Sequence, residues 1–273
     1  MTVANPKPLL AGIRVLDLTQ FLSGPFGSQI LADLGADVIK VEAPAGDLAR
    51  HIGSDGLYYG SINRNKRSIV ADIKVAEGVA LVRDLALSSD VIFENFRPGV
   101  LDRFGLGASD LRRAKPSLVW CSISGFGQDG PYRDKPAYDM IVQALSGGMS
   151  LTGEPGRTAV RSGIPIGDLA AGLYAVIGIL AAIVRNRATG EGETIDISML
   201  DCQAAMLSYQ AAYHLFNGVV PGLQGTRHDS IATYRGFECG SGTQIVVTAN
   251  TERMWQGLCR ALGLDNLIDD PRF

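Results

Sequence analysis

The sequence predicts an α/β protein with an open, parallel sheet. A strand–helix–strand pattern fills residues 13–42, and strand-like and helix-like segments alternate up to residue 216. The residue pattern changes after the stretch rich in Gly and Pro that follows. Strands that alternate with helices favour parallel pairing with right-handed crossovers. We therefore expect a Rossmann-like large domain at 1–216, a linker at 217–227 and the start of a smaller α+β domain at 228–273.

The composition is that of an ordinary soluble protein. Of 273 residues, 46% are hydrophobic and 19% are charged, and the net charge is −3. No stripe of Lys and Arg is visible, so we expect no nucleic-acid partner. The opening ten residues lack the apolar core of a signal peptide, and the scattered Cys and His residues do not cluster as metal ligands. We expect free thiols, no metal and a cytoplasmic location.

The first strand–helix–strand unit is delimited by Pro and Gly. Residues 13–18 read as a strand, and Pro25 suits the first turn of a helix that runs to Leu34. Gly35 ends that helix, and 36–42 form the next strand. Residues 125–130, after a strand at 118–124, carry the Gly spacing of a dinucleotide site. Because Pro131 follows and no helix pattern begins there, we expect no NAD or FAD.

Basic residues cluster around two later strands. The basic turn at 63–67 precedes a strand at 68–73 that ends at Lys74, and a helix follows at 75–88. The strand at 90–94 runs into a basic turn at 95–99, and Arg103 lies one helical turn further. Open α/β sheets bind ligands beyond the carboxyl ends of their strands. These residues form either a solvated surface or a phosphate site, and their spacing leaves both possibilities open.

A long apolar segment, 169–184, follows Asp168. Its 16 residues, rich in Ala and Gly, are short for a bilayer span, so they predict a buried core helix and no membrane. Asp168 is placed to be the N-cap of that helix, whose dipole would keep the carboxylate ionised. Its glycine-flanked turn also admits a second interpretation, a carboxylate nucleophile that a substrate can approach closely.

Further elements complete the expected order. Tyr138 and Asp139 open a helix-like run upstream of Asp168. Downstream we expect a strand at 193–198, one long helix at 199–216, a strand at 244–248 and a helix at 252–262.

Ordered sequence blocks then point to a family. They are G-I-R-V-L-D-L-T-Q from Gly12, L-A-D-L-G-A-D-V-I-K-V-E from Leu31, N-R-N-K-R-S-I from Asn63, E-N-F-R-P-G-V from Glu94, S-G-F-G-Q-D-G-P from Ser124, P-A-Y-D from Pro136, T-G-E-G-E-T-I-D-I-S-M-L from Thr189 and D-D-P-R-F at the end. Spread over nearly the whole chain, they resemble the family III CoA-transferases of the CaiB/BaiF type, which include formyl-CoA transferase, carnitine CoA-transferase and the α-methylacyl-CoA racemases.

The resemblance implies a reaction and its nucleophile. Asp168 would attack an acyl-CoA thioester and release CoA thiolate, and the acyl-aspartyl anhydride would pass through an aspartyl-CoA thioester to an acceptor carboxylic acid. Backbone N–H groups of the glycine turn are candidate donors to the developing oxyanion. CoA would be a substrate, with no permanently bound cofactor.

The resemblance also implies a CoA site along the large domain. Residues at the matching positions are Leu22, Ser23, Asp72, Ile73, Lys74, Asn95, Phe96, Arg97, Arg103, Tyr138 and Asp139. Lys74, Arg97 and Arg103 are the natural phosphate partners. Ala43 stands where some members carry an Arg, so one phosphate contact is lost or supplied elsewhere.

Two alternatives remain open. The racemases of the family use a His and an Asp, and their His falls on Tyr138, which is a poor general base with an ordinary phenol pKa near 10. This substitution favours transfer over racemisation. Family chains also continue well beyond the D-P-R-F turn, with a return segment that helps to close an interlocked dimer. We therefore expect a homodimer or a partner chain that supplies the missing part, or a chain that binds CoA but is inactive alone.

The small domain departs from formyl-CoA transferase in one further respect. That enzyme carries a glycine-rich loop which shields the anhydride, whereas residues 217–242 hold only scattered Gly. An oxalate or formate substrate is therefore not expected, and the sequence names neither the acyl donor nor the acceptor.

Overall fold

The computed structural model describes residues 7–53 and 55–272. The remaining positions, among them the first six residues of the segment considered for a signal peptide and the last residue of the predicted small domain, lie outside the described residues. The described chain forms two compact units, one comprising residues up to Gly148 with Arg161–Ala212, the other comprising Met149–Val160 with the chain from Tyr213 onward.

The first unit is built on a six-stranded parallel sheet in the order β3-β2-β1-β4-β5-β6. The strands are β1 (Arg14–Asp17), β2 (Asp37–Glu42), β3 (Arg67–Val70), β4 (Val91–Glu94), β5 (Val119–Ser124) and β6 (Thr194–Ser198). This order, with its reversal between β1 and β4, is that of the Rossmann sheet. The α/β class and the parallel pairing of the first two strands, both expected from the sequence, are confirmed.

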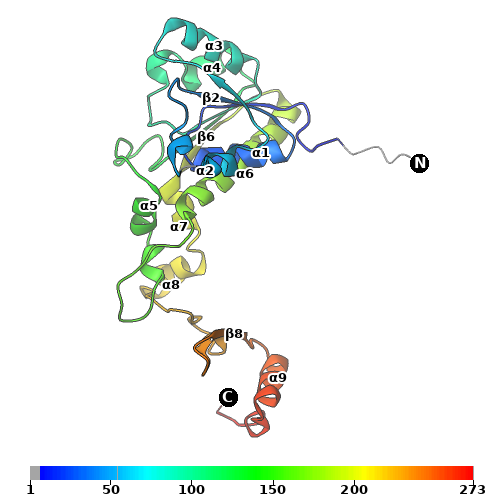
Figure 1. Cartoon of the computed structure of the whole chain (residues 1–273), viewed down its shortest axis with the longest axis vertical. Helices are drawn as coiled ribbons and strands as arrows, with labels where there is room; N and C mark the ends of the chain where they lie inside the picture. The colour runs from blue at the N-terminus through cyan, green and yellow to red at the C-terminus, as the bar shows by residue number, and fades with distance from the viewer. Residues whose placement is uncertain (1–6, 54, 273) are drawn as a thin grey trace, which may run out of the picture. The chain divides into compact units, whose positions relative to one another are not determined.

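Helices cover both faces of this sheet, as Figure 1 shows for α3 and α4 at the top and α1 and α6 below. The helices up to residue 217 are α1 (Ser23–Asp33), α2 (Leu57–Asn63), α3 (Ala76–Leu87), α4 (Ala108–Ala114), α5 (Asp139–Leu145), α6 (Ile166–Thr189), α7 (Met199–Ala205) and α8 (Tyr209–Asn217), with 3-10 turns η1 (Leu48–His51) and η2 (Asp102–Phe104). The central strands are consequently buried on both sides, and every residue of β4 and β5 is buried.

Two hydrophobic clusters separate by sheet face. Alternate strand residues such as Val15 and Phe93 pack with α1 and α6, whereas Leu16 and Ile92 pack with α3 and α4. This alternation follows from the two-residue period of side chains along a strand.

The helix α6 is long and apolar enough to cross a membrane, because it has 24 residues and its most apolar stretch has a mean hydropathy of 2.0. Half of that stretch is buried inside the structure. The buried side packs against α1, where a Cβ on Gly172 would lie 2.7 Å from the Ser23 carbonyl oxygen. Glycine at this position thus allows the close approach of the two helices. The opposite side exposes Leu173, Ile177 and Val184.

One expected helix is divided in two. The segment 199–216 was predicted as a single helix, but α7 ends at Ala205 and α8 begins at Tyr209. Ser208 between them has a φ of +52°, in the left-handed region that no helix interior uses. The boundary between the two compact units also falls within α8.

The second unit contains an antiparallel hairpin of β7 (Tyr234–Glu238) and β8 (Gln244–Thr248), the helix α9 (Glu252–Leu262) and 3-10 turns η3 (Met149–Leu151) and η4 (Asp265–Leu267). Thr251 caps α9 by accepting a hydrogen bond from the Met254 N–H. The contacts divide the chain differently from the predicted boundaries at 217 and 228. They start the second unit at Tyr213 and assign 149–160 to it.

Candidate active site

Two cavities open at the carboxyl edge of the parallel sheet, where sequence reasoning placed the ligand. The first has a volume of about 370 Å³ and lies among the loops that follow β1, β2, β3 and β4. The second, of about 340 Å³, lies among the loops after β1, β4 and β5 and reaches Asp168. Gln20 and Phe96 line both, so the two cavities are neighbours.

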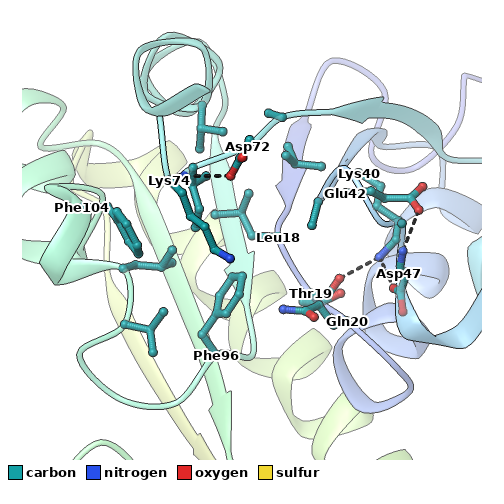
Figure 2. Close-up of a pocket in the computed structure, with 18 of the residues that line it drawn as sticks. Leu18, Thr19, Gln20, Lys40, Glu42, Asp47, Asp72, Lys74, Phe96 and Phe104 are labelled. Atoms are coloured by element: carbon teal, nitrogen blue, oxygen red, sulfur yellow. Dashed lines mark hydrogen bonds and ion pairs between the residues drawn. The ribbon is translucent and has the colours of Figure 1, made fainter. Parts of the chain in front are cut away.

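The first cavity has apolar walls with cationic groups. Leu18, Leu101 and Phe104 supply apolar surface, and Lys74 and Arg103 line the same space. Figure 2 shows Lys74 and Phe96 extending into it from the loops after β3 and β4. Neither cation has an ion pair with a carboxylate within the described part of the chain. An apolar pocket with unpaired cations suits a flat organic group that carries phosphates.

A buried ion pair forms one wall of this cavity. The Lys40 ammonium lies 2.8 Å from an Asp47 carboxylate oxygen, and both side chains are 1% exposed. Lys40 also donates to the Thr19 carbonyl oxygen at 2.7 Å, and the other oxygen of Asp47 accepts from the Phe21 N–H at 3.1 Å. The pair therefore fixes the loop that leads from β1 into α1 (Figure 2).

Asn95 fixes the same loop from the other side. Its amide oxygen accepts from the Gln20 N–H at 2.7 Å, and its amide nitrogen donates to the Gln20 carbonyl oxygen at 2.8 Å. The sequence prediction gave Asn95 a ligand contact, whereas these bonds commit its side-chain amide to the backbone of the loop after β1.

The second cavity combines aromatic rings with basic groups. The Phe21 ring lies 6.1 Å from the ring of Tyr58 and 6.3 Å from that of Tyr138. Phe21 has a φ of +68°, a backbone conformation that bulky residues rarely adopt and that is held here by the Asp47 hydrogen bond. The basic residues that line the cavity are Arg97, Arg133 and Lys135.

Asp168 lines this cavity from the first turn of α6. The helix begins at Ile166 after Pro165, so the prediction that Asp168 is the N-cap is wrong. Asp139 performs that role from the start of α5, because its carboxylate accepts from the Gly167 N–H at 2.8 Å and from the Asp168 N–H at 3.4 Å. A carboxylate from another helix thereby satisfies the first donors of α6.

The expectation that Asp168 is held ionised is also wrong. Burial raises the pKa of its carboxyl group to about 7, the Asp139 carboxylate adds to the increase, and a hydrogen bond from Ser23 opposes it. Desolvation and a like charge thus outweigh the dipole of the helix. Asp168 is consequently poised to change charge near neutral pH.

The same contacts remove one expected oxyanion donor. The Gly167 N–H, a candidate for that role in the sequence, already donates to Asp139. Asp139 is in turn held by Gln143, whose amide nitrogen donates to it at 2.7 Å and whose amide oxygen accepts from the Ser162 N–H at 2.8 Å.

The structure distributes the predicted CoA residues over the two cavities. Asp72, Ile73, Lys74, Phe96 and Arg103 line the first, and Leu22, Ser23, Asn95, Phe96, Arg97 and Tyr138 line the second with Asp168. Asp139 lines neither.

Sequence reasoning missed several members of the site. These are Gln20, Phe21, Tyr58, Arg133 and Lys135. The position of Gln20 and Phe21 directly after β1 was the one available signal, because ligands gather at that end of each strand.

No metal centre is built into these cavities. Within residues 7–53 and 55–272, no group of three or more His, Cys, Asp or Glu side chains could hold a metal ion, and the four cysteines are free.

Comparison with known proteins assigns the family. Residues 10–273 match CoA-transferase family III. The chain is 43% identical to a succinate–glutarate CoA-transferase of Agrobacterium fabrum and 42% identical to a human succinyl-CoA:glutarate CoA-transferase, in each case over 98% of its own length. It spans 70% of the bacterial relative and 62% of the human one.

Solved structures agree with this assignment. A CaiB/BaiF family protein from Brucella suis superposes with a TM-score of 0.87 at 40% identity, over 97% of this chain and 72% of that one. The chain therefore belongs to the family III CoA-transferases, an enzyme family, as the sequence blocks indicated.

Proposed function

We propose that the chain transfers CoA from an acyl-CoA to a carboxylic acid, with Asp168 as the nucleophile. One observation carries this proposal: a partly buried carboxyl group lies in a cavity that shares Gln20 and Phe96 with a second, cation-lined cavity. A ligand with a nucleotide at one end and a thioester at the other would occupy both. We place the CoA nucleotide in the first cavity, with Lys74 and Arg103 on its phosphates, and the thioester in the second.

The proposed reaction proceeds in four balanced steps. An Asp168 carboxylate oxygen bonds to the thioester carbonyl carbon, the C–S bond breaks, and CoA leaves as the thiolate. The thiolate then attacks the aspartyl carbonyl carbon of the anhydride, which releases the first acid as its carboxylate. The acceptor carboxylate attacks the aspartyl-CoA thioester and again expels the thiolate. Finally the thiolate attacks the acyl carbon of the new anhydride, which yields the new acyl-CoA and regenerates Asp168. Covalent catalysis replaces one difficult exchange with several easier ones.

The state of Asp168 matters to the first step. Only its ionised form is nucleophilic, and its pKa of about 7 leaves a large fraction ionised at neutral pH. A carboxylate with a raised pKa is also a stronger nucleophile than an ordinary one, because its charge is poorly solvated. The Ser23 hydroxyl donates a hydrogen bond to the Asp168 carboxylate and lines the same cavity, so it would hold that carboxylate toward the thioester.

Dicarboxylic acids are the acceptor class that we propose. The relatives are named for succinate and glutarate, and others for D-citramalate and mesaconate. A dicarboxylate presents one carboxylate for reaction and a second that requires a cation. Arg97, Arg133 and Lys135 place positive charge around the cavity that holds Asp168.

A transfer assay with matched variants tests this function. The purified chain is incubated with succinyl-CoA and glutarate, and glutaryl-CoA is measured by chromatography. We expect Asp168→Ala to reduce transfer to background. Asp201→Ala, which removes an exposed carboxylate from the first turn of α7, is expected to retain at least about half of the activity. Undiminished transfer by Asp168→Ala would refute the proposed nucleophile, and tight CoA binding without turnover would indicate a CoA-binding chain that is inactive alone.

We propose a homodimer, or a partner chain, in the cytoplasm, and CoA as a substrate without a resident cofactor. The apolar residues Leu173, Ile177 and Val184 exposed along α6 support an association, because exposed apolar stripes mark interaction surfaces. Sedimentation velocity over a range of concentrations tests it, and a monomer throughout would contradict it.

A further inference from the structure

A third cavity, of about 470 Å³, lies wholly within the second unit. Leu223, Gln224, residues 227–232 and Arg235, which is on β7, line it. The sequence marked this region only as a linker and the start of a small domain, and neither the Asp168 cavity nor its neighbour uses any of these residues.

Two arginines meet at this cavity. Arg227 and Arg235 stand directly opposite each other in an isolated antiparallel bridge, and both line the cavity. Residues opposite each other on an antiparallel pair project to the same face, and like charges in such a pair are destabilising. The chain nevertheless keeps two guanidinium groups at this position.

No carboxylate of the described chain neutralises this pair. The one acidic residue that lines the cavity, Asp229, lies 2.8 Å from the Nδ1 atom of His228 and accepts from the Ser230 hydroxyl at 3.0 Å. Neither Arg227 nor Arg235 has an ion pair with a carboxylate in the described ranges 7–53 and 55–272.

The Arg235 side chain is also partly withdrawn from solvent. Its guanidinium lies 5.1 Å from the centroid of the Phe237 ring, and its Nε atom is buried without a hydrogen-bond partner. A buried donor without a partner is unfavourable, so such an atom is a natural place for an acceptor from a ligand.

We propose that this cavity binds a small dicarboxylate, with Arg227 and Arg235 as the groups that hold it. Guanidinium groups pair with carboxylates through parallel hydrogen bonds, and an anion between the two arginines would relieve their repulsion. The choice of a dicarboxylate rests on the proposed function, which requires a second acid as CoA acceptor. The cavity then gives the second unit a dicarboxylate site of its own, separate from the acceptor that we place beside Asp168 in the second cavity.

Equilibrium binding tests the inference without any acyl-CoA. Glutarate is titrated into the full chain in a calorimeter, and the titration is repeated with inorganic phosphate as the competing class of anion. We expect glutarate to bind the unaltered chain, with phosphate at least about ten-fold weaker. Arg227→Met and Arg235→Met should each weaken glutarate binding by at least about ten-fold, as expected for the loss of a charged hydrogen-bond pair.

A matched variant separates a built site from general charge. Arg253 is an exposed residue in the first turn of α9 in the same unit, outside the cavity. Arg253→Met removes the same charge and should leave glutarate affinity within about two-fold. Should Arg235→Met fail to fold, as checked by thermal unfolding, the exposed Arg227 decides the outcome.

Four results would overturn the inference: no glutarate binding, equal binding of phosphate, unaltered binding by the folded cavity variants, or an equal loss with Arg253→Met. Because no thioester is present, these outcomes do not depend on whether Asp168 is acylated. If Asp168 proved not to be the nucleophile, the result of the glutarate titration would still stand. If glutarate did not bind, the proposal that Asp168 is the nucleophile would still stand.

Discussion

The Asp139 carboxylate is the second cause, after burial, of the raised pKa of Asp168, and the substitution Asp139→Asn tests its contribution. An Asn side chain keeps a carbonyl oxygen that can accept from the Gly167 N–H, so the start of α6 stays capped. The substitution removes the negative charge, and it also replaces the carboxylate oxygen that accepts from the Gln143 amide nitrogen with an NH2 group. We therefore expect the pKa of the Asp168 carboxyl group to fall from about 7, because a like charge that raised it is gone.

The size of the decrease follows from the order of causes. Burial is the largest contribution to the raised pKa and remains in the variant, whereas the Asp139 charge is the second contribution. We therefore expect the pKa of Asp168 in Asp139→Asn to fall below about 7 but to stay above the ordinary aspartate value of about 4, because the burial remains. A shift of 1 unit corresponds to about 1.4 kcal/mol between the two protonation states.

Carbon-13 NMR of the aspartate carboxyl groups measures this directly. The Asp168 signal is assigned by its absence from Asp168→Asn, and both proteins are titrated from pH 4 to pH 9. Gln143→Glu provides a contrasting variant, since it places a further carboxyl group beside Asp139. A pKa that stays the same or rises in Asp139→Asn would refute the role of Asp139, and a wild-type pKa near 4 would refute the burial argument itself.

Three further predictions concern stability. Lys40→Met leaves the fully buried Asp47 carboxylate without its partner and should lower the free energy of unfolding by roughly 3–5 kcal/mol. Arg67→Met breaks an exposed ion pair and should lower it by less than about 1 kcal/mol, and urea denaturation distinguishes the two values. Gly172→Ala would place a methyl group against a backbone carbonyl oxygen of α1 and should destabilise by about 1–3 kcal/mol, while Gly60→Ala, which meets no atom within 4 Å, should stabilise its helix by up to about 1 kcal/mol. Asp168→Asn should raise the free energy of unfolding by at most about 4 kcal/mol at pH 8 but only by about 1.5 kcal/mol at pH 5. The raised folded pKa makes the ionised wild type progressively less stable as the pH rises from about 4 to 7; an equal gain at both pH values would contradict that pKa.

Local patterns predicted the sheet well. Strand-like runs separated by helix-like runs predicted parallel pairing, and the parallel pairing of β1 with β2 confirms the βαβ unit. Pro25 lies in the first turn of α1, and Gly35, with a φ of +96°, follows its end, as their backbone preferences require. The carboxyl ends of the strands also predicted where the cavities lie. Each of these features depends on residues near one another in the sequence.

Features that depend on distant residues could not be predicted in this way. The capping of α6 by Asp139 involves residues 28 positions apart, so Asp168, which stands closer to the apolar run, looked like the cap. Lys40 lies in an apolar strand, and its burial becomes favourable only through Asp47 in a later loop. The break between α7 and α8 at Ser208 contains no Gly or Pro that could have predicted it, although Ser208 has a positive φ.

The central claim is that Asp168 becomes acylated, and peptide mass spectrometry after hydroxylamine trapping tests it most directly. The purified chain is mixed with a panel of acyl-CoAs, treated with hydroxylamine and digested. The account predicts a hydroxamate on the peptide that contains Asp168, formed with at least one acyl-CoA and absent from Asp168→Asn. Transfer of CoA by the same sample with no modification of that peptide, or with the modification on another carboxylate, would contradict it.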